Sequence, residues 1–528
     1  MRLINTETMM LEEFMGGYHA PKYAILSHTW GEEEVSFQDF THPNKETRCQ
    51  KLGFQKIEKT CQMARDAGLY AWVDTCCIDK TSSAELTEAI NSMFQWYRDA
   101  VVCFAWLADL SPGDSLAPED QNSRFKDCYW FKRGWTLQEL IAPKELKFYD
   151  REWAFRGTKA DLSDKISAIT KITPQVLQNA EVVYRLPIAQ RMSWAAGRQC
   201  TRVEDMAYCL LGIFDVNMPM LYGEGLKAFI RLQEEIARES NDLSLFAWRA
   251  TSIDQTHRGI LADSPSEFYD SSSITITNET DFNPDFAMTN KGLRITIDLY
   301  PGQNNLYLMA LKCLQPDGKV GTQEIGIWLK MHGGGVYSRV RYNEFGVVQP
   351  GEPGGKAKST SLFVSKRISS TLSATMGGSH RHAFMFRKGF NQRGAPVNYP
   401  DCEYEATVIR PEDCWDAQRR MFLAHGASSF TALAFLYSRT GPKPFIVAFG
   451  KTDDSAEPWL MLGSSAEWDV MRDIKNLGPI GSKINRRDLV LEGRGASVHV
   501  KALLQKVIID GHEVYCIDIS YLRPEVAS

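Results

Sequence analysis

The first part of the chain contains short apolar runs that predict buried strands. These runs lie at Tyr23–Ser27, Tyr70–Asp74, Val101–Leu107 and Leu146–Tyr149. Short apolar runs bounded by polar or turn-forming residues are typical of strands that are covered on both faces.

Helical spacing fills the segments between these runs. Apolar residues recur every three or four positions in Leu52–Ala67, and Gly68 is placed to end that helix. A second helix is expected behind Ser82 and Glu85, whose spacing is that of a capping box. Because strands and helices alternate, the sequence predicts an α/β domain at residues 1–157, with a parallel sheet covered on both sides.

The pattern then becomes helical and later strand-like. We expect residues 158–243 to form a helical extension, in which Thr201 and Glu204 make another capping box. From residue 244 on, strand-like runs lie between clusters of Gly, Pro, Asn and Asp. Residues 244–528 are therefore predicted to form a mostly antiparallel, sandwich-like β region, with a loop at residues 349–360.

Composition and charge narrow the possible partners. The chain has 528 residues and a net charge of −5, without a basic block, so nucleic acid is not expected as a partner. No apolar run approaches the ~18 residues of a membrane span. The 12 cysteines form no C-x-x-C pair, and no signal peptide is recognisable at the start. We therefore expect reduced thiols, a cytoplasmic location and no membrane.

Polar side chains follow two of the predicted strands where each leaves the sheet. The phrases SHTWG and DTCCIDK supply these candidates for a binding site: Ser27, His28, Trp30, Gly31, Asp74, Cys76 and Asp79. In open α/β sheets, ligands bind outside the carboxyl ends of the parallel strands. Each residue alone has an ordinary structural explanation, such as a core histidine or a capping aspartate. Their convergence on one edge predicts a small-molecule pocket.

The stretch FKRGWTLQEL brings a third group to the same edge. Wound as a helix, it places Leu137, Leu140 and Ile141 on the core side, with Trp135 and Glu139 together on another face. We expect this tryptophan and this acid to meet water. An acid that only caps a helix or forms an ion pair is the alternative.

Other motifs give weaker signals. GGKAKST is not a phosphate loop, because Pro350 and Ala357 stand where a glycine and a hydroxyl residue are needed. His380 and His382 lack a third ligand with suitable spacing, so no metal site is predicted. Cys76 and Cys77 with His28 would permit a thiol nucleophile, although buried cysteines more often serve packing.

The chain resembles the fungal heterokaryon-incompatibility (HET) domain family. The phrases that carry the resemblance lie between Tyr23 and Trp248: YAILSHTWG, WVDTCCIDK, EAINSMFQWYRDA, RGWTLQELIAP, RMSWAAGR and EDMAYCLLGIFDVNMPMLYGEG. The resemblance implies a role in fungal non-self recognition and regulated cell death. It also implies self-association and an incompatibility partner protein that the sequence does not identify.

HET domains are in turn similar to TIR domains, which implies a TIR/flavodoxin-like sheet. RGWTLQEL resembles the TIR phrase W-C-x-x-E-L, and some TIR domains cleave NAD with the glutamate of that phrase. Carried over, Glu139 becomes the catalytic carboxylate, and Trp135 and Trp30 become stacking surfaces. NAD is then the candidate substrate, and no cofactor is needed.

Two further interpretations stay open. A signalling module that binds partners without catalysis is the first alternative to an NAD hydrolase. A thiol hydrolase is the second.

Overall fold

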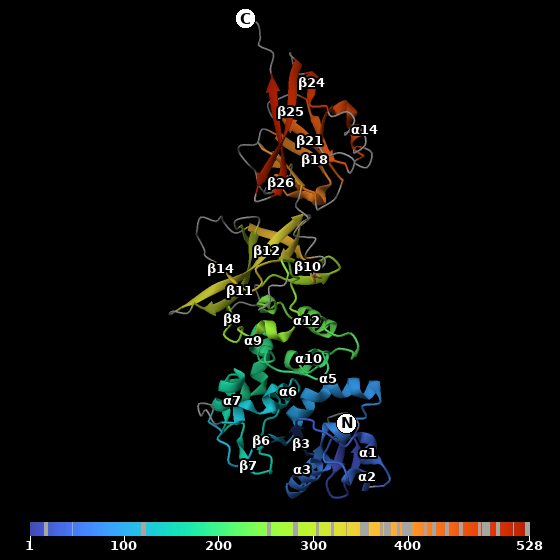
Figure 1. Ribbon diagram of the computed structural model, residues 1–528, viewed down its shortest axis with the longest axis vertical. Helices are drawn as coiled ribbons and strands as arrows, with labels where there is room; N and C mark the ends of the chain where they lie inside the picture. The colour runs from blue at the N-terminus through green and yellow to red at the C-terminus, as the bar shows by residue number, and fades with distance from the viewer. Residues whose placement is uncertain are drawn as a thin grey trace.

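The computed structural model describes most of the chain between Met1 and Leu522. The residues outside the description are 15–19, 45, 118–122, 251–254, 278–282, 302–305, 318–320, 334, 349–357, 370–372, 374–381, 388–390, 393–403, 417–419, 425–428, 439–442, 453–457, 474–476, 478–485, 493–496, 510–511 and 523–528. The molecule is elongated, with the N-terminal α/β domain at one end, helices next to it, and β-sheets continuing to the other end (Figure 1).

The N-terminal domain is built on a mixed sheet with a parallel centre. Its strands, in spatial order, are β2 (Met10–Glu13), β1 (Arg2–Asn5), β4 (Tyr70–Trp72), β3 (Tyr23–His28), β5 (Val102–Trp106), β6 (Leu146–Tyr149) and β7 (Phe155–Thr158). Strand β3 pairs in parallel with β4 and β5, and β5 pairs in parallel with β6. All six residues of β3 are buried, so this strand is covered on both faces. The predicted α/β domain with its parallel strands is confirmed.

One helix of this domain ends, and another begins, at the position that the sequence indicates. Helix α3 (Phe54–Asp66) stops before Gly68, which takes a left-handed φ of 67° that suits glycine. Helix α5 (Ser83–Asp99) begins after Ser82, whose hydroxyl accepts a hydrogen bond from the Glu85 amide. The Glu85 carboxylate accepts from the Asp79 amide at 2.8 Å instead of completing the box.

The helical extension contains these helices: α7 (Ser163–Thr170), α8 (Pro174–Gln178), α9 (Ile188–Ser193), α10 (Asp205–Tyr208), α11 (Leu211–Phe214) and α12 (Lys227–Glu239). The capping box predicted at Thr201 and Glu204 is wrong. The Glu204 carboxylate accepts hydrogen bonds from the amides of Gly223 and Gly225, both at 2.9 Å. It therefore fixes a distant turn instead of capping α10.

The β-rich part begins with one large sheet. Its strands, in spatial order, are β14 (Gly346–Val347), β12 (Thr322–Gly333), β13 (Val336–Arg339), β15 (Lys358–Val364), β10 (Gly292–Pro301), β11 (Leu306–Pro316) and β8 (Thr275–Ile276), with β9 (Phe286–Thr289) on β10. Most pairings are antiparallel, as predicted. Residues 349–357 of the predicted loop lie outside the described residues, whereas Lys358 to Thr360 belong to β15, so the loop prediction is wrong there.

Two further sheets form the C-terminal end. One contains β19 (Trp415–Asp416), β20 (Met421–Leu423), β16 (His382–Phe386), β26 (His512–Leu522), β25 (Ser497–Ile509) and β24 (Asp488–Glu492). The other contains β17 (Asn391–Gln392), β18 (Tyr404–Arg410), β21 (Phe430–Ser438), β22 (Phe445–Lys451) and β23 (Trp459–Ser464). Phe384 and Tyr515 of the first sheet share a buried core with Phe445 and Phe449 of the second, so the two sheets pack as a sandwich.

One hydrophobic core joins the α/β domain, the helical extension and the large β-sheet. Its members run from Leu3 to Val364, whereas the C-terminal sandwich has its own core. The domain boundary predicted near residue 244 stays a prediction. Residues of the same buried core lie on both sides of it. Among the described residues, the structure contains no helix with the length and apolar character that crossing a membrane requires.

Helix α11 packs directly on α5 at Gly212. A Cβ atom added at Gly212 would lie 2.1 Å from the Cβ of Phe94, so only glycine permits this approach. This contact holds the extension against the helix that carries Met93 and Tyr97.

We expect Gly212→Ala to lower the free energy of unfolding by about 1–3 kcal/mol, because the added methyl group forces α11 away from α5. Chemical denaturation of the full chain measures this change. Gly197→Ala is the matched control, since an added Cβ there meets no atom within 4 Å. Equal stability of the two variants would contradict the packing described.

Candidate active site

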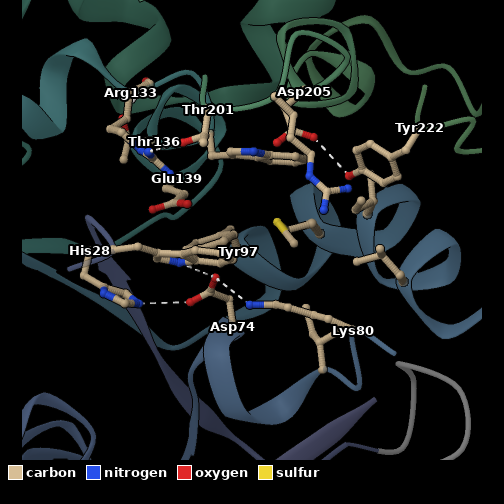
Figure 2. Close-up of a pocket in the computed structure, with 17 residues that line it drawn as sticks. His28, Asp74, Lys80, Tyr97, Arg133, Thr136, Glu139, Thr201, Asp205 and Tyr222 are labelled. Carbon is tan, nitrogen blue, oxygen red and sulfur yellow. Dashed lines mark hydrogen bonds and ion pairs between the residues drawn. The ribbon is translucent and has the colours of Figure 1, made fainter. Parts of the chain in front are cut away.

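A pocket of about 300 Å³ opens where β3 and β4 leave the sheet. The residues that line it are His28, Trp30, Asp74, Ile78, Lys80, Leu86, Ile90, Met93, Tyr97, Arg133, Trp135, Thr136, Glu139, Thr201, Arg202, Asp205 and Tyr222. Figure 2 shows His28, Asp74 and Lys80 on one side and Thr201 and Asp205 on the opposite side. The α/β domain and the helical extension therefore build this pocket together.

Glu139 lies on α6 (Thr136–Ile141) and reaches the pocket from the inside. Only 7% of the residue is exposed, so the prediction that it meets bulk water is wrong. Residues of the α/β domain and of the helical extension together surround this face of α6, which the helix periodicity of one short segment could not reveal. The acid is nevertheless not enclosed by packing, because it lines the cavity.

A short chain of hydrogen bonds holds the Glu139 carboxyl group. The Ser27 hydroxyl donates to Glu139 Oε2 at 2.5 Å and accepts from the Trp130 indole at 2.8 Å. The Tyr97 hydroxyl lies close to Glu139 and donates to the Leu26 carbonyl at 3.0 Å. Ser27 therefore positions the carboxyl group although it does not line the cavity itself.

The environment keeps Glu139 protonated at neutral pH. Burial is the largest cause that raises its pKa, to about 8, and the nearby charge of Asp74 adds to the rise. The hydrogen bond from Ser27 and the positive charge of Arg133 oppose it without cancelling it. A buried acid with such a strongly shifted pKa inside a pocket is a common feature of functional sites.

Asp74 is the centre of the opposite cluster. One carboxylate oxygen lies 3.0 Å from His28 Nε2, and the other accepts from the Trp30 indole at 2.8 Å. Lys80 Nζ lies 3.8 Å from the same carboxylate and 3.8 Å from the centroid of the Trp30 ring. Burial opposes ionisation of Asp74, but Lys80, His28 and Trp30 together hold its pKa below the ordinary range.

The second wall comes from the helical extension. Asp205 accepts a hydrogen bond from the Tyr222 hydroxyl at 3.0 Å. Burial raises the pKa of Asp205, and the nearby Tyr222 and Trp135 side chains oppose the rise. Trp135 therefore lies beside a carboxyl group, as Trp30 does on the first wall.

The remaining sequence-predicted residues take other places. Gly31 is exposed and its amide donates to Glu34 Oε1, while Asp79 accepts hydrogen bonds from Gln38 and Thr81. Cys76 is fully buried behind the pocket. None of these three candidates lines the cavity. Burial also raises the pKa of the Cys76 thiol well above its ordinary value, which disfavours a thiolate nucleophile.

The sequence motifs do not identify several polar residues that line the cavity. These are Lys80, Tyr97, Arg133, Thr136, Thr201, Arg202, Asp205 and Tyr222. Lys80 closes the phrase DTCCIDK and Arg133 opens RGWTLQEL, so position within quoted phrases was the available signal. No local sequence pattern indicates that residues near 201–222 lie opposite this edge of the sheet.

Among the described residues, no three His, Cys, Asp or Glu side chains gather as a metal site requires. The pocket instead offers indole rings, carboxyl groups and cationic side chains. Such a set suits an organic ligand with both a flat ring and charged groups.

Comparison with known proteins identifies the N-terminal part. Residues 23–124 match the family model of the heterokaryon incompatibility protein (HET). Over 231 residues the chain is 48% identical to the vegetative incompatibility protein HET-E-1 of Podospora anserina. The chain therefore contains a region similar to the HET domain of a fungal incompatibility protein. The HET model covers β3 to β5, and the pocket also needs residues beyond it.

The match to HET-E-1 covers 42% of this chain and 17% of the length of that relative. Residues 227–306 match a domain of unknown function, DUF8212, which includes α12 and β10. No solved structure matches the chain significantly.

We expect Glu139→Gln to stabilise the protein more at pH 8 than at pH 5. The pKa of Glu139 is about 8 in the folded chain against an ordinary value of 4.5, so the folded wild type becomes less stable as pH rises between these values. Glutamine lacks this ionisation. The gain at pH 8 relative to pH 5 should be about 2–4 kcal/mol.

Denaturant unfolding at several pH values measures the difference. Glu88→Gln, at an exposed position of α5, is the matched control and should change stability by less than about 0.5 kcal/mol. A gain for Glu139→Gln that does not vary with pH would contradict the buried carboxyl group described here.

Proposed function

We propose that this protein is a heterokaryon-incompatibility effector in fungal non-self recognition and regulated cell death, and that it acts by hydrolysing NAD. The observation that carries this proposal is Glu139, a buried carboxyl group that faces a ligand-sized pocket between two ring-bearing walls. The likeness to HET-E-1, a protein named for vegetative incompatibility, supports the biological role.

The arrangement of strands supports a TIR/flavodoxin-like domain. Numbered by their order in the chain, the parallel strands β3, β4, β5 and β6 lie in the spatial order 2-1-3-4. Flavodoxin-like sheets have the order 2-1-3-4-5 and bind ligands beside the first strand, at the carboxyl edge. Ser27 and His28 stand at that edge, since they end β3.

The chemistry of NAD cleavage requires one well-placed carboxylate. The bond between ribose C1′ and the nicotinamide nitrogen breaks, and its electron pair leaves with the nitrogen as neutral nicotinamide. Water adds to C1′ and releases one proton, which gives ADP-ribose. Because the leaving group departs uncharged, no general acid is needed, in contrast to glycosidases with two carboxyl groups. Glu139 stabilises the positive charge that develops on ribose.

Substrate binding would prepare Glu139 for this task. A pyridinium ring close to the carboxyl group favours the ionised form and lowers its pKa. Trp135 and Trp30 provide flat surfaces for a ring, and the Trp30 indole is held by its hydrogen bond to Asp74. The positive charge of the substrate thus generates the carboxylate where it is needed.

A signalling module without catalysis is the second candidate function. The observation that favours it is the raised pKa of Glu139, since a protonated carboxyl group cannot stabilise a cation. In that case the pocket would hold a regulatory ligand, and self-association or a partner protein would carry the signal.

We expect purified wild-type protein to release nicotinamide from NAD, and Glu139→Gln to lower kcat by about 10²–10³-fold. Glutamine keeps the shape and the Ser27 contact but cannot carry the charge. Glu88→Gln should retain wild-type turnover. If self-association is required, the rate should rise faster than linearly with protein concentration. Absence of turnover at every concentration would instead support the signalling module.

The pH profile provides an independent check. Because the ionised form of Glu139 is the active one, kcat/KM should rise about tenfold per pH unit below pH 8 and level off above it. Initial rates between pH 6 and pH 9 measure this profile. A profile that is flat or falls over this range would exclude Glu139 as the group that must ionise.

A further inference from the structure

Two arginines at the pocket make no close ion pair. Arg133 and Arg202 both line the cavity, the first half-buried and the second exposed. Among the described residues, neither guanidinium group lies within ion-pair distance of a carboxylate, although the charge of Arg133 acts on Glu139 and that of Arg202 on Asp205. Lys80, by contrast, lies 3.8 Å from the Asp74 carboxylate. The two guanidinium groups therefore remain able to bind an anion directly.

The backbone and neighbouring rings hold both arginines in place. The Arg133 carbonyl accepts from Arg198 Nη1 at 2.9 Å, and Arg133 Nη1 donates to the Thr201 hydroxyl at 3.4 Å. The guanidinium carbon of Arg202 lies 4.4 Å from the centroid of the Tyr222 ring. Arg133 contacts Thr201, and Thr201 directly precedes Arg202 in the chain. The two arginines therefore border the same part of the pocket.

The charges on this wall favour an anion. Asp205 is the acidic residue of the extension that lines the pocket, and its carboxyl group already accepts a hydrogen bond from Tyr222. The two guanidinium groups therefore add positive charge beside a carboxyl group that is already hydrogen-bonded. Arginine is also the side chain best suited to phosphate, since its planar fork can donate two parallel hydrogen bonds.

We propose that Arg133 and Arg202 form a subsite for the diphosphate of a nucleotide ligand. The proposal rests on the proposed function in one respect. It places the diphosphate of the same substrate whose nicotinamide ring faces Glu139. Both arginines lie outside residues 23–124, so the region that follows the HET match supplies the phosphate contacts.

Binding of ADP-ribose to the full chain tests this subsite without requiring catalysis. ADP-ribose carries the diphosphate and lacks nicotinamide, so it probes the phosphate end directly. Isothermal titration calorimetry should show that Arg133→Gln and Arg202→Gln each weaken its Kd about tenfold. The affinity of the wild type should also fall as the salt concentration rises.

Arg124→Gln is the matched control, because Arg124 is exposed and does not line the pocket. Thermal unfolding of each variant verifies that the fold is retained, and Arg202→Lys should recover part of the lost affinity. Failure of the wild type to bind ADP-ribose, or equal affinity in the wild type and both glutamine variants, would overturn the subsite.

The result separates the two proposals. If both arginine variants lose affinity while the wild type does not cleave NAD, the subsite stands and the hydrolase proposal fails. If the wild type cleaves NAD while ADP-ribose binding is unchanged in both variants, hydrolysis stands and the subsite is wrong.

Discussion

The candidate site depends on a carboxyl group that is buried yet faces a cavity. Burial raises the pKa of Glu139, and Ser27 fixes its position through a bond that continues to Trp130. An unpaired buried carboxylate is costly, so the surroundings of Glu139 favour the neutral acid. A cation brought into the pocket reverses that preference. The group is therefore sensitive to the charge of the ligand.

This constraint explains why the pocket has two walls from different parts of the chain. The α/β domain supplies Glu139 and the groups that hold it, Ser27 and Trp130. The helical extension adds Asp205 and Tyr222 on the opposite side of the cavity. A tryptophan lies beside a carboxyl group on each wall, Trp30 with Asp74 and Trp135 with Asp205. The cavity is therefore lined by indole rings from both sides.

The sequence predicts the architecture well because local patterns determine it. Buried runs identify the parallel strands, and β6 has the predicted bounds, Leu146–Tyr149. Glu139 and Trp135 could be placed on one helix face, but the burial of Glu139 could not be predicted, since its surroundings come from segments far away in the chain, such as Ser27 and Asp205. The capping box predicted from the spacing of Thr201 and Glu204 is wrong for a similar reason. The Glu204 carboxylate accepts hydrogen bonds from glycine amides about 20 residues later in the chain. Contacts between segments far apart in the chain leave no periodic signal.

The pKa of the Glu139 carboxyl group itself tests the central claim most directly. Infrared difference spectra of wild type against Glu139→Gln, recorded across pH, isolate the C=O stretch of the protonated acid. This band should disappear with a midpoint near pH 8 when no ligand is added, and at lower pH when NAD or another pyridinium ligand is bound. A midpoint close to the ordinary value of about 4.5, unchanged by such a ligand, would contradict it.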